Sequence, residues 1–164
     1  IFNILGPLTN PAGAPNQVMG VFHPDLVGIQ ARVLRELGSR HVMIVHGEDG
    51  LDEITLSGYT SIAELKDGAI REYRIDPADF GIAHAPLAAL RADSAEQSKT
   101  MLLAVLDGQS GPTRDIVLLN AAAAIYTAGV SGSLADGVAL ARSVIDSGAA
   151  RAKLDALVQL SQSL

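Results

Sequence analysis

Cysteine and tryptophan are absent from the sequence, and only 4% of its 164 residues are aromatic. Without cysteine there are no disulfides, thiolate zinc sites, iron–sulfur clusters or cysteine nucleophiles, so any metal ligand is an oxygen or an imidazole nitrogen. The scarcity of aromatic side chains argues against a stacking platform for single-stranded nucleic acid. The lack of cysteine is also compatible with a reducing cytoplasm.

Positive charge and long apolar runs are scarce as well. Twelve Lys and Arg residues against eighteen Asp and Glu residues give a formal net charge of −6, which argues against an extended contact with nucleic-acid phosphates or anionic membranes. No run reaches the roughly 18 apolar residues that a membrane-spanning helix requires, and the first residues lack the basic segment of a signal peptide. We therefore expect a cytoplasmic protein that binds neither nucleic acid nor membranes.

The first part of the sequence has the periodicity of an α/β domain. Three prolines and two glycines crowd residues 5–16, so we expect residues 1–16 to be a hinge and loop segment. Apolar runs over 17–22 and 41–45 are typical of buried parallel strands, and the amphipathic stretch 25–37 between them predicts a helix. Strand, helix and strand together predict a right-handed βαβ unit.

The remainder of the sequence predicts one hairpin and then only helices. The Asp67-Gly68 pair between the strand-like segments 61–65 and 70–75 is a strong hairpin signal. Capping and apolar periodicity then predict helices over 94–106, 113–130, 134–145 and a last stretch with Leu154, Leu157 and Val158 on one face. The predicted fold class is α/β, with a sheet at the front and a helical C-terminal half.

An acidic loop after the 41–45 strand is the most unusual local feature. It has no Lys or Arg and holds four carboxylates, those of Glu48, Asp49, Asp52 and Glu53. Carboxylate oxygens suit Mg²⁺, Mn²⁺ or Ca²⁺, and the carboxyl end of a parallel strand is where ligands bind in open α/β sheets. The alternative interpretation of the same residues is a solvated surface loop with Asp-Gly turns.

Two other polar residues, His46 and Asn120, are expected to be structural. Lone residues of these types beside apolar segments more often satisfy a nearby backbone group than bind a ligand. The sequence has neither a nucleophile elbow nor the phosphate-binding signatures GxGxxG and GxxxxGK[ST]. Acyl transfer therefore has no support from the residues.

Three segments of the chain carry a family resemblance. They are residues 2–11 (FNILGPLTNP), 46–55 (HGEDGLDEIT) and 120–126 (NAAAAIY). Together and in this order, they make the chain resemble the anthranilate phosphoribosyltransferase family, over all 164 residues but only the second half of the family's length. The resemblance implies a nucleoside phosphorylase/phosphoribosyltransferase-like large domain. Residues 17–164 would be the C-terminal part of that α/β domain, without the family's N-terminal helical domain and the first part of the large domain.

The resemblance also implies an activity. Members of the family transfer the phosphoribosyl group of phosphoribosyl pyrophosphate to anthranilate in tryptophan biosynthesis, with Mg²⁺ and usually as homodimers. By motif, Asp52 and Glu53 would bind Mg²⁺ on the pyrophosphate side, and Pro11 would lie near the anthranilate path. No catalytic residue is assigned to this chain, because the family's other substrate-binding motifs precede these segments. We therefore expect the chain alone to be inactive and to bind Mg²⁺ weakly at best.

Three alternatives remain open. A pyrimidine nucleoside phosphorylase would share the superfamily fold, although the complete Leu-Gly-Pro-Leu and Gly-Leu-Asp-Glu motifs argue against it. A non-catalytic relative that binds nucleic acid would need a basic surface, which a net charge of −6 does not provide in this part. The third alternative is a folding fragment without activity, with unpaired strand edges.

Overall fold

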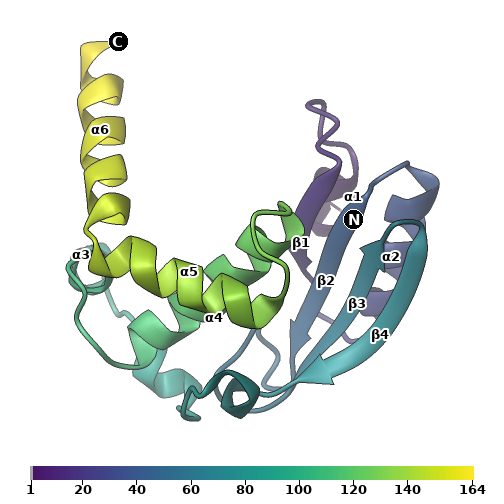
Figure 1. The fold of residues 1–164 in the computed structure, drawn as a ribbon, viewed down its shortest axis with the longest axis horizontal. Coiled ribbons are helices and arrows are strands. Elements are labelled where there is room, and N and C mark those ends of the chain that lie inside the picture. Colours follow the sequence, from purple (N-terminus) through teal and green to yellow (C-terminus); the bar gives the residue numbers. More distant parts are fainter. Residues whose placement is uncertain (1) are drawn as a thin grey trace.

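A four-stranded mixed sheet forms the first part of the fold (Figure 1). The computed structural model describes residues 2–164, with side chains from residue 4 onward. The strands lie side by side in the order β1 (Asn16–Gly20), β2 (His41–Gly47), β3 (Thr60–Lys66) and β4 (Ala69–Ile75). β1 and β2 are parallel, whereas β3 and β4 extend the sheet by antiparallel pairing.

Helix α2 (Asp25–Glu36) connects β1 to β2, so the predicted βαβ unit is confirmed. The chain leaves this helix at Gly38, whose φ of 85° is the left-handed conformation that glycine adopts without strain. All seven residues of β2 are buried. The reason is that α2 covers one face of the sheet and α4 (Pro112–Thr127) covers the other.

The predicted hairpin is confirmed as well. Asp67 and Gly68 join β3 to β4 with φ angles of 51° and 80°. Positive φ at both central residues is the requirement of the two-residue turn that matches the twist of a hairpin. This turn fixes the register in which Thr60 faces Ile75 at the other end of the pair.

A short helix, α1 (Phe2–Leu8), lies where the sequence predicts a loop. The prediction of a loop was therefore wrong for Phe2–Leu8, whereas Ile1 lies outside the described residues. Pro7 removes one backbone donor from the helix. Thr9 closes the last turn instead, because its backbone N–H and its hydroxyl both donate to the carbonyl of Leu5, at 3.1 and 2.9 Å. The chain is then irregular up to β1, as predicted.

The second part of the chain is helical, as predicted. Two 3₁₀ turns, η1 (Pro77–Phe80) and η2 (Leu87–Leu90), precede α3 (Ala95–Leu106), α4, α5 (Leu134–Asp146) and α6 (Ala149–Ser163). The side chain of Ser94 accepts a hydrogen bond from the N–H of Gln97 at 3.1 Å and caps α3. α4 is the central helix, because it packs against both the sheet and α5.

Helix α6 forms where the apolar positions 154, 157 and 158 predict a last helix. It extends away from α5, on the side of the molecule far from the sheet (Figure 1), and none of its described residues is buried. Leu157 and Val158 are 61% and 43% exposed. Periodicity predicts which side of a helix is apolar, but not whether this chain supplies the surface that covers it. Among the described residues, no helix has both the length and the apolar character needed to cross a membrane.

A buried acidic network ties the hairpin to α4. Glu64 on β3 accepts hydrogen bonds from Tyr126 on α4 (2.7 Å) and Tyr73 on β4 (3.1 Å), and its Oε1 lies 3.0 Å from Nε2 of His41. Burial alone would raise the pKa of Glu64, but these hydrogen bonds outweigh it and lower the pKa below its ordinary value of 4.5. The charged carboxylate is therefore the form that stabilises the fold.

Because of this network, we expect the free energy of unfolding to fall in acid. A carboxyl group whose pKa is lowered by folding contributes fully above its ordinary pKa, and the contribution disappears as the pH falls through the lowered value. Glu64→Gln should lower the free energy of unfolding at neutral pH by about 1.5–3 kcal/mol and flatten its decline in acid. Denaturant unfolding at a series of pH values measures both effects. Glu72→Gln is the control, because Glu72 is exposed and pairs only with Arg32 at the surface. Equal effects of the two substitutions would contradict the account.

Candidate functional site

The loop 48–59 brings the predicted metal-binding residues to the carboxyl ends of both parallel strands. It leaves β2, crosses to the end of β1 and returns to β3. A Cβ atom on Gly20, the last residue of β1, would lie 1.5 Å from the carbonyl oxygen of Asp52. Only glycine permits this approach of the loop backbone to the strand. Sequence reasoning missed Gly20, although a glycine inside the apolar run 17–22 was the available signal.

Asp52 and Glu53 are both exposed at this edge of the sheet. In a regular strand two adjacent side chains point to opposite faces, but the backbone here bends at both residues. Neither carboxylate makes a hydrogen bond or an ion pair with any residue of the described part of the chain. Two adjacent carboxylates on a turning backbone are thus free to bind a ligand in front of β1 and β2.

Asp49 has a different role from its acidic neighbours. Its Oδ2 accepts hydrogen bonds from the hydroxyls of Ser57 (2.6 Å) and Thr55 (2.7 Å), and its Oδ1 accepts one from the N–H of Leu51 (3.2 Å). Burial would raise the pKa of Asp49, but these hydrogen bonds outweigh it and lower the pKa. Asp49 therefore fixes the shape of the loop.

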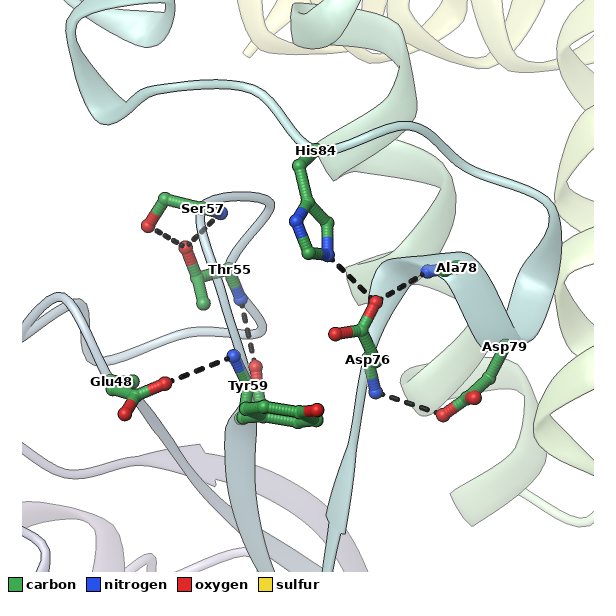
Figure 2. Close-up of polar contacts among 9 residues, drawn as sticks. Glu48, Thr55, Ser57, Tyr59, Asp76, Ala78, Asp79 and His84 are labelled. Atoms are coloured by element: carbon green, nitrogen blue, oxygen red, sulfur yellow. Dashed lines mark hydrogen bonds and ion pairs between the residues drawn. The ribbon is translucent and has the colours of Figure 1, made fainter.

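The remaining acidic residue of the loop, Glu48, also faces the loop itself. Its Oε2 accepts from the N–H of Tyr59 at 3.4 Å (Figure 2). Across residues 2–164, no three His, Asp or Glu side chains gather closely enough to hold a metal ion by themselves. The four carboxylates of the acidic loop thus divide into two that shape it and two, Asp52 and Glu53, that remain available.

His46 and Asn120, the two residues expected to satisfy backbone groups, both do so. Nδ1 of His46 lies 2.7 Å from the carbonyl oxygen of Val21, which joins the ends of β2 and β1. Asn120 on α4 binds both backbone groups of Ile54 in the loop, accepting from the N–H at 3.0 Å and donating to the carbonyl at 2.9 Å. Ile54 itself is buried, with 1% of its surface exposed. The loop is therefore anchored to a helix 66 residues further along the chain.

A second acidic cluster beside the loop was missed by sequence reasoning. Figure 2 shows His84 pointing toward Asp76, with Nε2 and Oδ1 2.7 Å apart. Asp76 also accepts from the N–H of Ala78 at 2.8 Å, and its own N–H donates to Asp79 at 2.9 Å. The pKa of Asp76 is lowered by the Ala78 hydrogen bond first and by His84 second. This arrangement caps η1, and an acidic residue three positions after Asp76 was its sequence signal.

Pro11 lies at the opposite end of the sheet. Its loop leads into the start of β1, where the carbonyl of Pro15 accepts from the N–H of Arg40 at 2.7 Å, just before β2 begins. Asp52 and Glu53 follow the end of β2. The loop before β1 and the turn after β2 are correspondingly at opposite ends of the sheet in Figure 1. The structure brings Asp52 and Glu53 together but does not bring Pro11 to them.

In open α/β sheets ligands bind beyond the carboxyl ends of the parallel strands, and this is the edge where Asp52 and Glu53 lie. In agreement, the chain belongs to the glycosyl transferase family, a/b domain, whose model matches residues 1–151. The chain is 68% identical to the anthranilate phosphoribosyltransferase of Laribacter hongkongensis, over 100% of this chain and 48% of that protein. It is 67% identical to that of Chromobacterium violaceum, with the same coverage. The resemblance inferred from the three sequence segments is confirmed.

Solved structures of anthranilate phosphoribosyltransferases have the same fold. The enzyme of Thermus thermophilus superposes with a TM-score of 0.87 at 42% identity, over 96% of this chain and 46% of that chain. The Saccharomyces cerevisiae enzyme in complex with PRPP and Mg also gives a TM-score of 0.87, at 26% identity, over 99% of this chain and 47% of that chain. The predicted fold class is therefore confirmed. The chain spans about half the length of the curated relatives it matches.

Proposed function

We propose that this chain supplies the metal-holding part of an anthranilate phosphoribosyltransferase. The complete enzyme transfers the phosphoribosyl group of phosphoribosyl pyrophosphate to the amine of anthranilate. The observation that carries the proposal is the pair of free carboxylates, Asp52 and Glu53, at the carboxyl edge of the parallel strands. Support comes from the high identity to proteins of that name and from yeast relatives solved with PRPP and Mg and with 4-fluoroanthranilate.

The donor set of this edge fits Mg²⁺. Mg²⁺ prefers hard oxygen ligands and is usually held by one or two carboxylates together with substrate phosphates and water, rather than by a full protein cage. Two carboxylates without a third protein ligand nearby in the described part of the chain match that pattern. When bound, Mg²⁺ offsets the negative charge that develops on the departing pyrophosphate. Asp52 and Glu53 would hold it on the pyrophosphate side.

The other residues of the loop hold these two carboxylates in place. Gly20 permits the backbone of Asp52 to lie on the end of β1, and Asp49 fixes the turn through its three hydrogen bonds. The amine of anthranilate is neutral at neutral pH, so its attack on the sugar depends more on orientation than on a strong base. The proposed reaction therefore does not require this chain to supply a strong general base.

Other features of the intact protein follow from the family resemblance. We propose that residues 1–16 form a hinge between domains, that residues 17–164 belong to the large α/β domain, and that the intact protein is a cytoplasmic homodimer. Pro11 would then lie near the anthranilate path. Since Pro11 and the Asp52–Glu53 pair lie at opposite ends of the sheet, Pro11 takes no part in holding the metal.

An assay of the intact protein against the 164-residue chain tests the proposed function. The intact protein should consume anthranilate, followed by loss of its fluorescence, when given phosphoribosyl pyrophosphate and Mg²⁺, and a chelator should stop the reaction. The chain alone should form no product, because it spans only about half the length of the relatives that carry this name. Phosphorolysis of thymidine without this transfer would instead assign a nucleoside phosphorylase. A salt-sensitive DNA shift without transfer would assign a nucleic-acid-binding relative.

A further inference from the structure

The pairing between Asn120 and Ile54 resembles a rung of a β-ladder. The side-chain amide of Asn120 presents one acceptor and one donor, and they meet the N–H and the carbonyl of the same residue, at 3.0 and 2.9 Å. A neighbouring strand would satisfy a backbone in the same way. Within residues 2–164 no strand pairs with the segment around Ile54, so a side chain from α4 takes the place of one.

Asn120 is itself held rigidly. Its Nδ2 also donates to the carbonyl of Ile116, one turn earlier on α4, at 3.1 Å. The neighbouring residues Leu118 and Leu119 are buried in the core, with 0% and 2% of their surface exposed. The amide therefore has a fixed position relative to the sheet, and its hydrogen bonds hold Ile54 in a fixed position as well.

The loop backbone is held at two points, one on each side of Glu53. On one side, the carbonyl of Asp52 lies against Gly20 on β1. On the other side, the N–H that Asn120 accepts belongs to the peptide bond between Glu53 and Ile54. Fixing the plane of that peptide restricts the ψ angle of Glu53 and so the direction in which its side chain leaves the backbone.

We propose that Asn120 is a positioning residue for the metal site. By fixing the peptide after Glu53, it holds the Glu53 carboxylate beside that of Asp52, in the arrangement that binds Mg²⁺ before the metal arrives. The proposal rests on the proposed function, because it takes these carboxylates as the metal ligands. When a residue that hydrogen-bonds to a metal site and orients its ligands is removed, metal affinity typically falls about 10–100-fold.

The test is the Mg²⁺ concentration that gives half the maximal rate of phosphoribosyl transfer by the intact protein. Asn120→Ala should raise it about 10-fold or more, because the carboxylates lose their fixed direction. Binding of Mn²⁺, followed by its electron paramagnetic resonance signal in the absence of turnover, should weaken by the same factor. Thr127→Ala is the matched control on the same helix. It removes a buried hydrogen bond of 2.6 Å to the carbonyl of Ala123, and in the described part of the chain the Thr127 hydroxyl makes no hydrogen bond to the loop, so stability should fall while metal affinity stays unchanged.

A measurement on the unaltered protein tests the same proposal without a substitution. The amide hydrogen of Ile54 should exchange slowly both without and with Mg²⁺ and phosphoribosyl pyrophosphate, since its partner is in place beforehand. Exchange that is fast until the ligands bind would overturn the proposal.

The outcomes separate this inference from the function on which it rests. If Asp52→Asn with Glu53→Gln shifts the Mg²⁺ titration but Asn120→Ala shifts it no more than Thr127→Ala does, Asn120 is structural only and the inference fails. If the double substitution leaves the titration unchanged, the metal assignment in the proposed function fails, and the inference fails with it.

Discussion

Replacing Asp52 by Asn and Glu53 by Gln in the intact protein is expected to lower the rate of phosphoribosyl transfer by about 100-fold, since the metal offsets several kcal/mol of charge in the transition state. The concentration of Mg²⁺ needed for half-maximal rate should rise as well. Amide oxygens still fill the same space but carry no charge, so the metal loses its electrostatic attraction to the loop. A titration of the rate with Mg²⁺ at saturating phosphoribosyl pyrophosphate measures both changes.

Glu48→Gln provides the matched control for this experiment. Glu48 belongs to the same acidic loop, but its Oε2 faces the N–H of Tyr59. A glutamine oxygen can accept that hydrogen bond, so rate and Mg²⁺ dependence should both stay close to those of the unaltered protein. If the double substitution behaves like this control, Asp52 and Glu53 do not hold the metal.

Gly20→Ala is expected to displace the backbone of the same site at the end of β1. Its Cβ atom would lie 1.5 Å from the carbonyl oxygen of Asp52, so the loop backbone must move away from β1. Overpacking of this kind costs about 1–3 kcal/mol of folding free energy. The displaced carboxylates should also lower the transfer rate by more than the loss of stability explains. Denaturant unfolding and the transfer assay together separate the two effects.

Gly132→Ala is a suitable comparison for Gly20→Ala. The added Cβ of Gly132 would meet its nearest neighbour, an oxygen of Asp136, at an ordinary distance of 3.5 Å. This substitution should therefore leave both stability and transfer nearly unchanged. An alanine at position 20 that is tolerated equally well would contradict the close packing of the loop on β1.

The elements of the sheet and helix α2 can be predicted from the sequence because their signals are local. The βαβ unit follows from two apolar runs with an amphipathic stretch between them, and the hairpin follows from Asp67 and Gly68, whose positive φ angles the tight turn requires. The same kind of signal located the acidic loop, since its carboxylates directly follow a predicted strand.

Features that depend on contacts between residues far apart in the sequence cannot be predicted from local signals. Nothing near Asn120 indicates that its amide binds Ile54, and nothing near Gly20 indicates that Asp52 will lie against it. Local composition was also misleading at α1, where Pro7 and its neighbours indicated a loop but Thr9 completes a helical turn. The exposure of α6 has the same origin, because an apolar stripe does not specify what covers it.

We propose that Asp52 and Glu53 hold the metal that neutralises pyrophosphate, and the most direct test is to locate that metal. A crystal structure of the intact protein with phosphoribosyl pyrophosphate and Mn²⁺ would locate the metal by its anomalous scattering. We expect an Mn²⁺ ion that is coordinated by pyrophosphate oxygens and by at least one carboxylate oxygen of Asp52 or Glu53. An ion bound to pyrophosphate with both carboxylates outside its coordination sphere would contradict the proposal.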